Sequence, residues 1–176
     1  VHLLGIGGIG MSALGRWFGH EGYAVSGYDR TPSPLTEELI AEGMQISFED
    51  SLETIPDFVK DTPETALIIW TPAMPKDSPQ LNFFRDNGFQ LKKRSEVLGI
   101  LTSTYYTIAV AGTHGKTTTS SMIAHMLKSA GKPVVAFLGG ITQNYKSNLI
   151  LGDKKSKEPT LVVVEADEFD RSFLRL

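Results

Sequence analysis

Cysteine is absent from this sequence of 176 residues. That absence excludes disulfides, cysteine-ligated zinc and a cysteine nucleophile, and it suits a reducing compartment, so we expect a cytoplasmic protein. No apolar run is long enough to cross a bilayer, and no secretory leader is visible. An excess of positive charge is also missing, because 17 Lys and Arg stand against 20 Asp and Glu. We therefore expect neither a membrane nor a nucleic acid as partner, since binding to nucleic acid needs clustered positive charge.

The sequence does contain enough apolar residues for a packed core, with 41% hydrophobic and 21% charged residues. Apolar runs that read as strands alternate with segments of helical spacing, and such alternation predicts a parallel sheet covered by helices. The expected strands of the first part are "VHLLGIG", "AVSGYD", "ALIIWTPAM" and, as an edge strand, "FQLKKRS". Helices are expected after the first glycines, after "TPSP" and over residues 79–88.

The pattern restarts after a short helix over residues 95–104. A new strand, a glycine loop and a helix follow, and a last apolar strand, "LVVVE", ends in acids. The polar stretch over residues 145–160 predicts an exposed loop or hairpin. We expect a Rossmann-like first domain over residues 1–103 and, over residues 104–176, the opening part of a P-loop α/β ATPase domain. Because the sequence opens inside a strand, we expect it to be a piece of a longer protein.

The stretch "AGTHGKTTTSSM" indicates a site for a nucleoside triphosphate. A loop between a buried strand and a helix N-terminus presents unpaired backbone N–H groups to an anion. Lys116 adds a charge for the outer phosphates and Thr117 offers a hydroxyl to Mg²⁺. The loop is a variant, because Val110 stands where the usual pattern has its first glycine. The alternative is a lysine that merely begins a helix.

An acid at the end of a neighbouring strand would complete a Mg·ATP site. Glu165 ends the run "LVVVE", and Asp167 and Glu168 follow it. These residues favour a metal held by Thr117 and Glu165, although a solvated acidic turn would look the same in sequence.

The first glycine loop, "GIGGIGM", indicates a diphosphate. Gly5, Gly7 and Gly10 fit G-x-G-x-x-G between a strand and a helix. Asp29 lies 29 − 10 = 19 residues beyond Gly10, where a ribose-binding acid would lie. The pattern does not distinguish NAD from another nucleotide, and a tight turn without a ligand remains an alternative. An ATP site directly downstream favours a ligase or kinase that acts on a nucleotide diphosphate.

These stretches together resemble the Mur ligases of bacterial cell-wall synthesis. The resemblance rests on "HLLGIGGIGMSAL", "TPAM", "KKRSEVLG", "AVAGTHGKTTTSSM" and "VVEADEFDRSFLRL", which occur in the family's order and cover nearly the whole chain. It also explains the variant loop, since the family uses G-T-x-G-K-T. By this resemblance the first loop holds the diphosphate of a UDP-sugar and the second holds the phosphates of ATP.

The resemblance implies ATP, Mg²⁺, UDP-N-acetylmuramate and L-alanine as the cofactors and substrates of the longer protein. The lactyl carboxylate would attack the γ-phosphate, and the alanine amine would displace phosphate from the resulting acyl phosphate. The family has three domains, so the piece is expected to bind the UDP-sugar without turning it over.

Residue roles follow from the same resemblance. Lys116 would neutralise phosphate charge, and His114 would contact the γ-phosphate or the sugar carboxylate, or only shape the loop. Arg94 would hold substrate or pair with Glu96, and Asn148 would lie near the sugar unless it is an exposed loop residue. The expected ATP-binding residues are Gly112, Thr113, His114, Gly115, Lys116, Thr117 and Thr118. Those expected for the UDP-sugar are Gly7, Gly8, Ile9, Gly10, Met11, Ser12, Asp29, Thr71, Pro72, Ala73, Arg94 and Asn148.

Other features are expected to be structural. His2 is predicted to be packed, His20 and His125 lack metal-ligand partners at a matching spacing, and Met122 and Met126 are predicted to lie in the core with their helix. Three alternative functions remain: a recycling ligase that adds a tripeptide to the same UDP-sugar, an NAD-dependent oxidoreductase, and a nucleotide sensor without catalysis.

Overall fold

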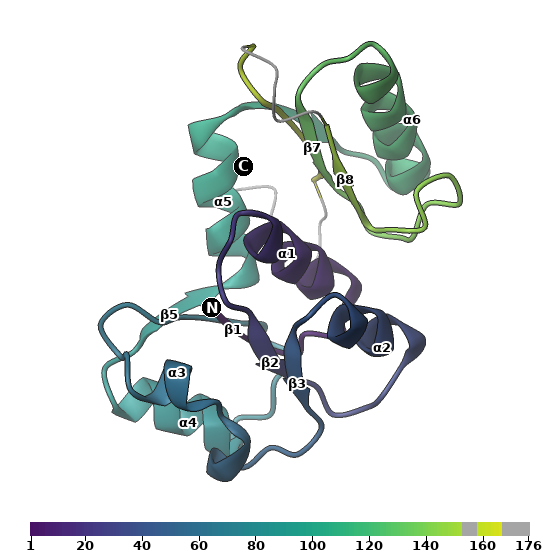
Figure 1. The fold of residues 1–176 in the computed structure, drawn as a ribbon. Helices are drawn as coiled ribbons and strands as arrows, with labels where there is room; N and C mark the ends of the chain where they lie inside the picture. Colours follow the sequence, from purple (N-terminus) through teal and green to yellow (C-terminus); the bar gives the residue numbers. More distant parts are fainter. Residues whose placement is uncertain (153–157, 167–176) are drawn as a thin grey trace. The chain divides into compact units, whose positions relative to one another are not determined.

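The computed structural model describes residues 1–152 and 158–166. The chain forms two compact units, Val1–Arg94 and Ser95–Leu176, which are described separately. The boundary between them lies at the start of α5 (Arg94–Thr104), and the boundary expected near residue 103 lies at the end of this helix. The predicted α/β class with parallel sheets is confirmed in both units (Figure 1).

The first unit is built on a five-stranded parallel sheet of order β3-β2-β1-β4-β5. Each strand runs parallel to its neighbours, with Leu3 opposite Gly27 on one side and Ile69 on the other. The edge position predicted for β5 is confirmed. The strands are β1 (His2–Leu4), β2 (Ser26–Tyr28), β3 (Gln45–Ser47), β4 (Leu67–Trp70) and β5 (Gln90–Lys93).

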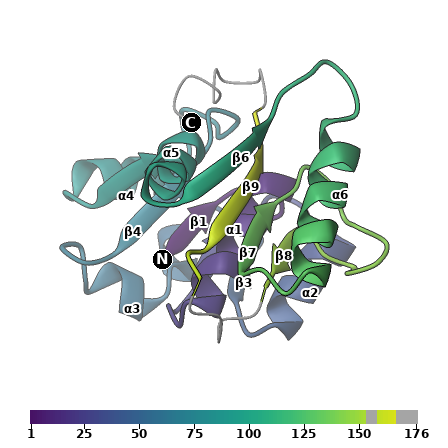
Figure 2. The same cartoon turned by 90° about the horizontal axis from the view of Figure 1, so that it is seen from above.

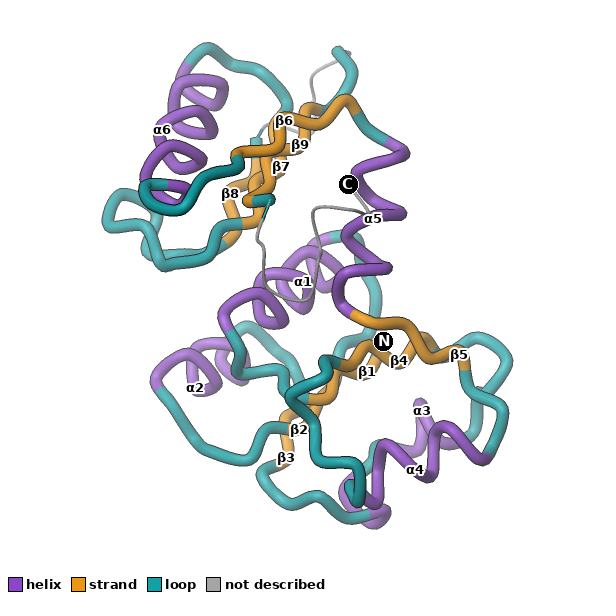
Figure 3. The backbone as a smooth tube through the Cα atoms, turned by 180° about the vertical axis from the view of Figure 1, so that it is seen from behind, coloured by secondary structure: helices purple, strands orange, loops and turns teal. Residues whose placement is uncertain are grey.

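Helices cover both faces of this sheet, α1 and α2 on one and α3 and α4 on the other (Figure 3). Ser-Pro begins two of them: Ser33 Oγ accepts from Thr36 N at 3.2 Å and Ser78 Oγ accepts from Leu81 N at 3.2 Å, while each following proline suits the first helical position. The elements are α1 (Ile9–His20), α2 (Pro34–Ala41), the 3-10 turn η1 (Leu52–Thr54), α3 (Asp57–Lys60) and α4 (Pro79–Asp86).

The ion pairs of Arg16 join α1 to α2. The Arg16 side chain is 7% exposed and its guanidinium lies 2.8 Å from both Glu38 and Glu42, whose side chains are about half exposed. A buried arginine therefore keeps two charged partners that remain hydrated, which avoids the large desolvation cost of a fully buried pair.

The second unit has a four-stranded sheet of order β6-β9-β7-β8, in which only β8 runs antiparallel to its neighbour. Helix α6 (Lys116–Ser129) lies along one face of this sheet and packs on β7 and β9 (Figure 2). Ala124, Val134, Ala136 and Val163 are buried between the helix and the sheet. The strands are β6 (Tyr106–Val110), β7 (Val134–Phe137), β8 (Leu149–Leu151) and β9 (Leu161–Glu165).

Two expectations about the second unit are wrong. Met122 and Met126 are each 60% exposed, so they lie on the outer face of α6 and not in the core. The exposed-loop reading of residues 145–160 misses β8, because Leu149 and Ile150 are buried against β7. The antiparallel partner of β8 is β7, which lies outside this stretch, and residues 153–157 lie outside the described residues.

Candidate functional site

The first glycine loop lies where the strand order of the first sheet reverses. Strand β1 has β2 on one side and β4 on the other, so the connections after β1 and β4 leave in opposite directions. Ligands of open α/β sheets bind in the crevice that this reversal creates at the carboxyl ends of the strands. The structure places Gly7, Gly8 and the start of α1 after β1, and residues 71–73 after β4, so the residues predicted for the UDP-sugar follow both strands.

Asp29 fixes the conformation of this loop. Its carboxylate follows β2 and accepts hydrogen bonds from Gly7 N at 2.7 Å and from Thr31 N at 3.1 Å. Charge-assisted bonds of this kind are stronger than neutral ones, so Asp29 ties the first loop to the end of β2. It holds the backbone that would cradle a phosphate, a role that the ribose-acid pattern did not suggest.

Arg94 lies against the first turn of α1. A Cβ placed on Gly10 would collide with the Arg94 guanidinium. Gly10 is therefore required for the close approach of this side chain to the helix start. A guanidinium at a helix N-terminus forms a positive site that suits a diphosphate.

The other residues predicted for the UDP-sugar lie in helix α1 and in the segment before β8. Ile9, Met11 and Ser12 belong to α1, where Met11 and Ser12 are buried and Ser12 Oγ donates to Ile9 O at 2.9 Å. Asn148 belongs to the second unit, just before β8, and it is fully buried. The expectation of an exposed loop residue at Asn148 is therefore wrong.

The second glycine loop joins β6 to α6 and lies next to the end of β9. Strands β6 and β9 pair in parallel, with Val110 directly opposite Glu165. Val110, the last residue before the loop, and Glu165, the predicted acid, therefore lie side by side at the end of the sheet. This arrangement brings together the loop, the helix N-terminus and a carboxylate, as a Mg·ATP site requires.

Two hydrogen bonds hold the Glu165 carboxylate at this position. Thr117 Oγ1 donates to one oxygen at 3.0 Å and Gly139 N donates to the other at 2.7 Å. The side chains of Thr117 and Glu165 predicted for Mg²⁺ therefore meet. Carboxylate and hydroxyl oxygens are the donors that Mg²⁺ prefers, so the pair fits this ion. Asp167 and Glu168 lie outside the described residues, and the described part of the chain has no cluster of three or more His, Asp or Glu suited to a metal.

The loop itself depends on Gly115, which begins α6 in the left-handed conformation with φ +76°. Residues with a side chain avoid that conformation, so glycine is required there. Lys116 follows, and its ammonium donates to Gly112 O at 2.8 Å. Thr113 and His114 are exposed in the loop, and Thr118 is exposed in the first turn of α6. All the residues predicted for ATP thus belong to one loop and one helix turn.

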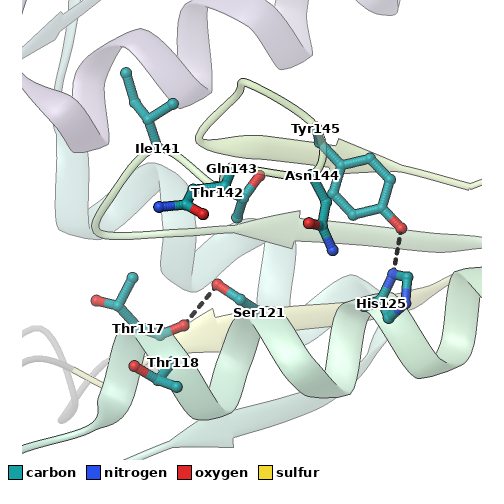
Figure 4. Close-up of a pocket in the computed structure, with 9 residues that line it drawn as sticks. All are labelled: Thr117, Thr118, Ser121, His125, Ile141, Thr142, Gln143, Asn144 and Tyr145. Carbon is teal, nitrogen blue, oxygen red and sulfur yellow. Dashed lines mark hydrogen bonds between the residues drawn. The ribbon is translucent and has the colours of Figure 1, made fainter.

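A pocket of about 450 Å³ adjoins this site and was not predicted from the sequence. Figure 4 shows Thr117, Thr118, Ser121 and His125 of α6 on one side and residues 141–145 on the other. His125 Nδ1 lies 2.8 Å from the Tyr145 hydroxyl and closes one end. Sequence patterns gave no signal for this pocket, because the loop after β7 meets α6 only in the folded sheet.

No helix among the described residues is long and apolar enough to cross a membrane.

Comparison with known proteins gives consistent matches over the whole chain. The family model "Mur ligase family, catalytic domain" matches residues 1–106, and "Mur ligase middle domain" matches residues 110–176. The UDP-N-acetylmuramate–L-alanine ligase of Cytophaga hutchinsonii is 56% identical over 100% of this chain and 37% of its own length. The enzyme of the same name from Porphyromonas gingivalis is 53% identical over 100% of the chain and 38% of its own length.

Solved structures agree with these matches. The UDP-N-acetylmuramate–alanine ligase of Thermotoga maritima is 31% identical, with a TM-score of 0.79, over 93% of this chain and 36% of its own. A murein peptide ligase from Psychrobacter arcticus is 27% identical, with a TM-score of 0.82, over 99% of this chain and 40% of its own. The chain thus spans little more than a third of the length of the curated relatives it matches.

The two sheets and their glycine loops define an α/β protein with a nucleotide-type loop in each of two units. The chain belongs to the Mur ligase family, as the match to residues 1–106 and the identity to curated members show.

Proposed function

We propose that the protein to which this chain belongs is an ATP-dependent ligase that joins L-alanine to the lactyl carboxylate of UDP-N-acetylmuramate. The observation that carries the proposal is the meeting of Thr117, Glu165 and the glycine loop at the ends of β6 and β9. The relatives named for this reaction, at 53–56% identity, support the choice of amino acid. Among the solved structures, the alanine ligase of Thermotoga maritima at 31% identity and the murein peptide ligase at 27% are nearly equally similar, so the curated relatives carry the choice of alanine over a tripeptide.

The residues suit activation of a carboxylate by phosphorylation. Oxide is a poor leaving group, so the carboxylate would first attack the γ-phosphate and displace ADP to form an acyl phosphate, from which the amine would then displace phosphate. Amides of residues 112–118 would cradle phosphate oxygens and Lys116 would neutralise the charge that develops on them. Thr117 and Glu165 would hold Mg²⁺, which supplies further neutralisation of the phosphates.

The first unit would hold the nucleotide part of the acceptor. The Arg94 guanidinium and the start of α1 supply positive potential for a diphosphate, and residues 71–73 and the end of β2 lie at the same edge of the sheet. The chain alone is expected to bind the UDP-sugar without forming the amide bond, since it spans 37–38% of those relatives.

Release of ADP by the full-length protein tests this function. We expect release only when UDP-N-acetylmuramate and L-alanine are both present, and no release when a tripeptide replaces alanine. Lys116→Ala should lower kcat by about 100-fold or more, because one charge contact to the transition state is lost. Lys132→Ala is the matched control, since Lys132 pairs with Glu158 on the surface at 2.7 Å. ADP release without any amino acid would overturn the proposal.

A further inference from the structure

Two consecutive glycines, Gly139 and Gly140, follow β7 and have no role of their own in the function proposed above. Strand β9 lies between β6 and β7 in the sheet, and Phe137 at the end of β7 pairs with Val164, the residue before Glu165. The segment that leaves β7 therefore passes Glu165 on the side opposite to the loop after β6. The Glu165 carboxylate is thus flanked by two loops, one on each side.

Space, and not backbone conformation, requires glycine at position 139. Gly139 and Gly140 do not have a positive φ, unlike Gly112 and Gly115 of the phosphate loop. A Cβ on Gly139 would lie 2.8 Å from Glu165 Oε2 and 3.2 Å from Glu165 Cδ. Real Cβ atoms essentially never approach another atom so closely, so any side chain at position 139 has to displace the carboxylate.

The Gly139 backbone also makes a directed contact with this carboxylate. Its N–H donates to Glu165 Oε1 at 2.7 Å, while Thr117 Oγ1 donates to Oε2 at 3.0 Å. Each oxygen is held by a donor from a different segment and keeps a lone pair for a further partner. Gly140 lies against the other residue of the pair, since a Cβ there would lie 3.3 Å from Thr117 Cγ2. The two glycines therefore pack against both residues that are expected to hold Mg²⁺.

We propose that Gly139 is a positioning residue of the metal site: its N–H and its lack of a side chain orient the Glu165 carboxylate. The inference rests on the proposed function, in which Thr117 and Glu165 hold Mg²⁺ beside the phosphates. Outer-shell partners fix the orientation of a ligating carboxylate, and their loss lowers metal affinity about 10- to 100-fold. Gly139 acts through Glu165 and is not itself a ligand.

Binding of an ATP analogue with and without metal tests this role. Calorimetric titration of the full-length protein with AMP-PNP in EDTA, and again in Mg²⁺, measures the gain in affinity that the ion supplies. Gly139→Ala should reduce this gain about tenfold and leave the metal-free affinity unchanged, because the added methyl group displaces the Glu165 carboxylate. An equal loss of affinity with and without Mg²⁺ would show a general disturbance of the site and would overturn the inference.

Two other glycines calibrate the measurement. Gly140→Ala should have a smaller effect than Gly139→Ala, because its methyl group needs Thr117 to shift by only a few tenths of an ångström. Gly19→Ala is the matched control, since its methyl group would lie 3.8 Å from Met44 Cε, an ordinary contact in the other unit. It should change neither affinity. A Mg²⁺ gain in Gly139→Ala as large as that in Gly19→Ala contradicts the positioning role.

A second substitution separates positioning from folding. Glu165→Asp shortens the side chain by one methylene group and withdraws the carboxylate from the methyl group of Gly139→Ala. In this background Gly139→Ala should cause no further loss of the Mg²⁺ gain, whereas the same loss in both backgrounds would refute an effect through Glu165. If Gly139→Ala alone does not fold, recovery of the fold in the double variant supports the inference, and an unfolded double variant contradicts it.

The same protein separates this inference from the proposed function. A wild-type protein that gains affinity from Mg²⁺ but releases no ADP with L-alanine loses the proposed function, and the gain in Gly139→Ala still decides the positioning role. A wild-type protein that releases ADP as expected, together with a full gain in Gly139→Ala, keeps the proposed function and loses the inference. A wild-type protein without any gain from Mg²⁺ contradicts the inference directly.

Discussion

His2 is buried in β1, the central strand of the first sheet, although its side chain can ionise. Its Nδ1 lies 2.8 Å from Ser26 Oγ and its Nε2 lies 3.1 Å from Gln80 Oε1. Because an amide oxygen only accepts, Nε2 carries the proton and Nδ1 accepts from Ser26. Burial lowers the pKa of His2 to about 4, since the charged form would lose its hydration. The packed histidine predicted from the sequence is confirmed.

This burial predicts a pH dependence of the first unit's stability. Between pH 6.5 and about 4 the unfolded chain binds a proton at His2 and the folded chain does not, so the free energy of unfolding falls as pH falls through that window. Lowering the pH from 7.5 to 5.5 should cost about 1 kcal/mol. Urea unfolding followed by tryptophan fluorescence measures it, because Trp17 and Trp70 both belong to the first unit.

Two variants separate His2 from the other titrating groups. His2→Gln should have a lower free energy of unfolding at every pH, but this free energy should fall less between pH 7.5 and 5.5 than it does in wild type. His20→Gln, which changes an exposed residue, should keep most of the fall in the free energy of unfolding between these two pH values. Equal slopes in wild type and His2→Gln would show that His2 is not the source.

At the scale of elements, helix α6 has a left-handed glycine at each end. Gly115 precedes it with φ +76° and Gly131 follows it with φ +72°, where Gly131 N donates to Lys128 O at 3.0 Å. An alanine at either position would lower the free energy of unfolding by about 1 kcal/mol, because a side chain strains the left-handed backbone equally at both positions. Only Gly115→Ala should also weaken ATP binding, since only its amide lies in the phosphate loop. Calorimetric titration with Mg·ATP and thermal unfolding of both variants measure the two effects, and equal loss of binding in Gly131→Ala would refute a local role for the loop.

The long elements were predictable from the sequence because they bury a regular apolar pattern. Helices α1 and α4 and strands β1, β4 and β9 all follow such a pattern. Strand β3, η1 and α3 were not predicted, since elements of three or four residues are too short to show a period. Met122 and Met126 have apolar side chains at helical spacing, yet the sheet contacts a different face of α6.

The candidate site was predictable to the extent that it is local in sequence. Each glycine loop lies within a few residues, and Glu165 was found because it ends a strand. The hydrogen bond from Gly7 to Asp29, the approach of Arg94 to Gly10 and the pocket beside α6 join residues from 20 to over 80 positions apart. Such contacts depend on strand order and register, which no single segment specifies.

For the whole molecule, each unit presents its loop at the carboxyl ends of parallel strands. One chain therefore has two positive helix starts, α1 with Arg94 and α6 with Lys116. Two separate loops favour two different phosphate ligands over one dinucleotide. A dehydrogenase would leave the second loop without a role, whereas a ligase that acts on a nucleotide sugar uses both.

Calorimetric titration of this chain with UDP-N-acetylmuramate, and with NADH in parallel, tests that division. We expect the UDP-sugar to bind and NADH to be rejected. Gly10→Asp should abolish binding of the UDP-sugar, because a carboxylate at the start of α1 would repel the diphosphate and capture the Arg94 guanidinium. Gly10→Ala should weaken it less, since the flexible end of Arg94 can move aside for a methyl group.

Thermal unfolding of these variants shows whether either substitution disturbs the fold. The charge argument predicts that adding Arg94→Ala to Gly10→Asp does not restore binding, because the repelling carboxylate remains and the guanidinium is gone. If wild type bound NADH but not the UDP-sugar, and Gly10→Asp no longer bound NADH, the first loop would be a dinucleotide site. The Mg·ATP titration of Gly10→Asp should match wild type, since the second loop belongs to a separate unit with its own sheet.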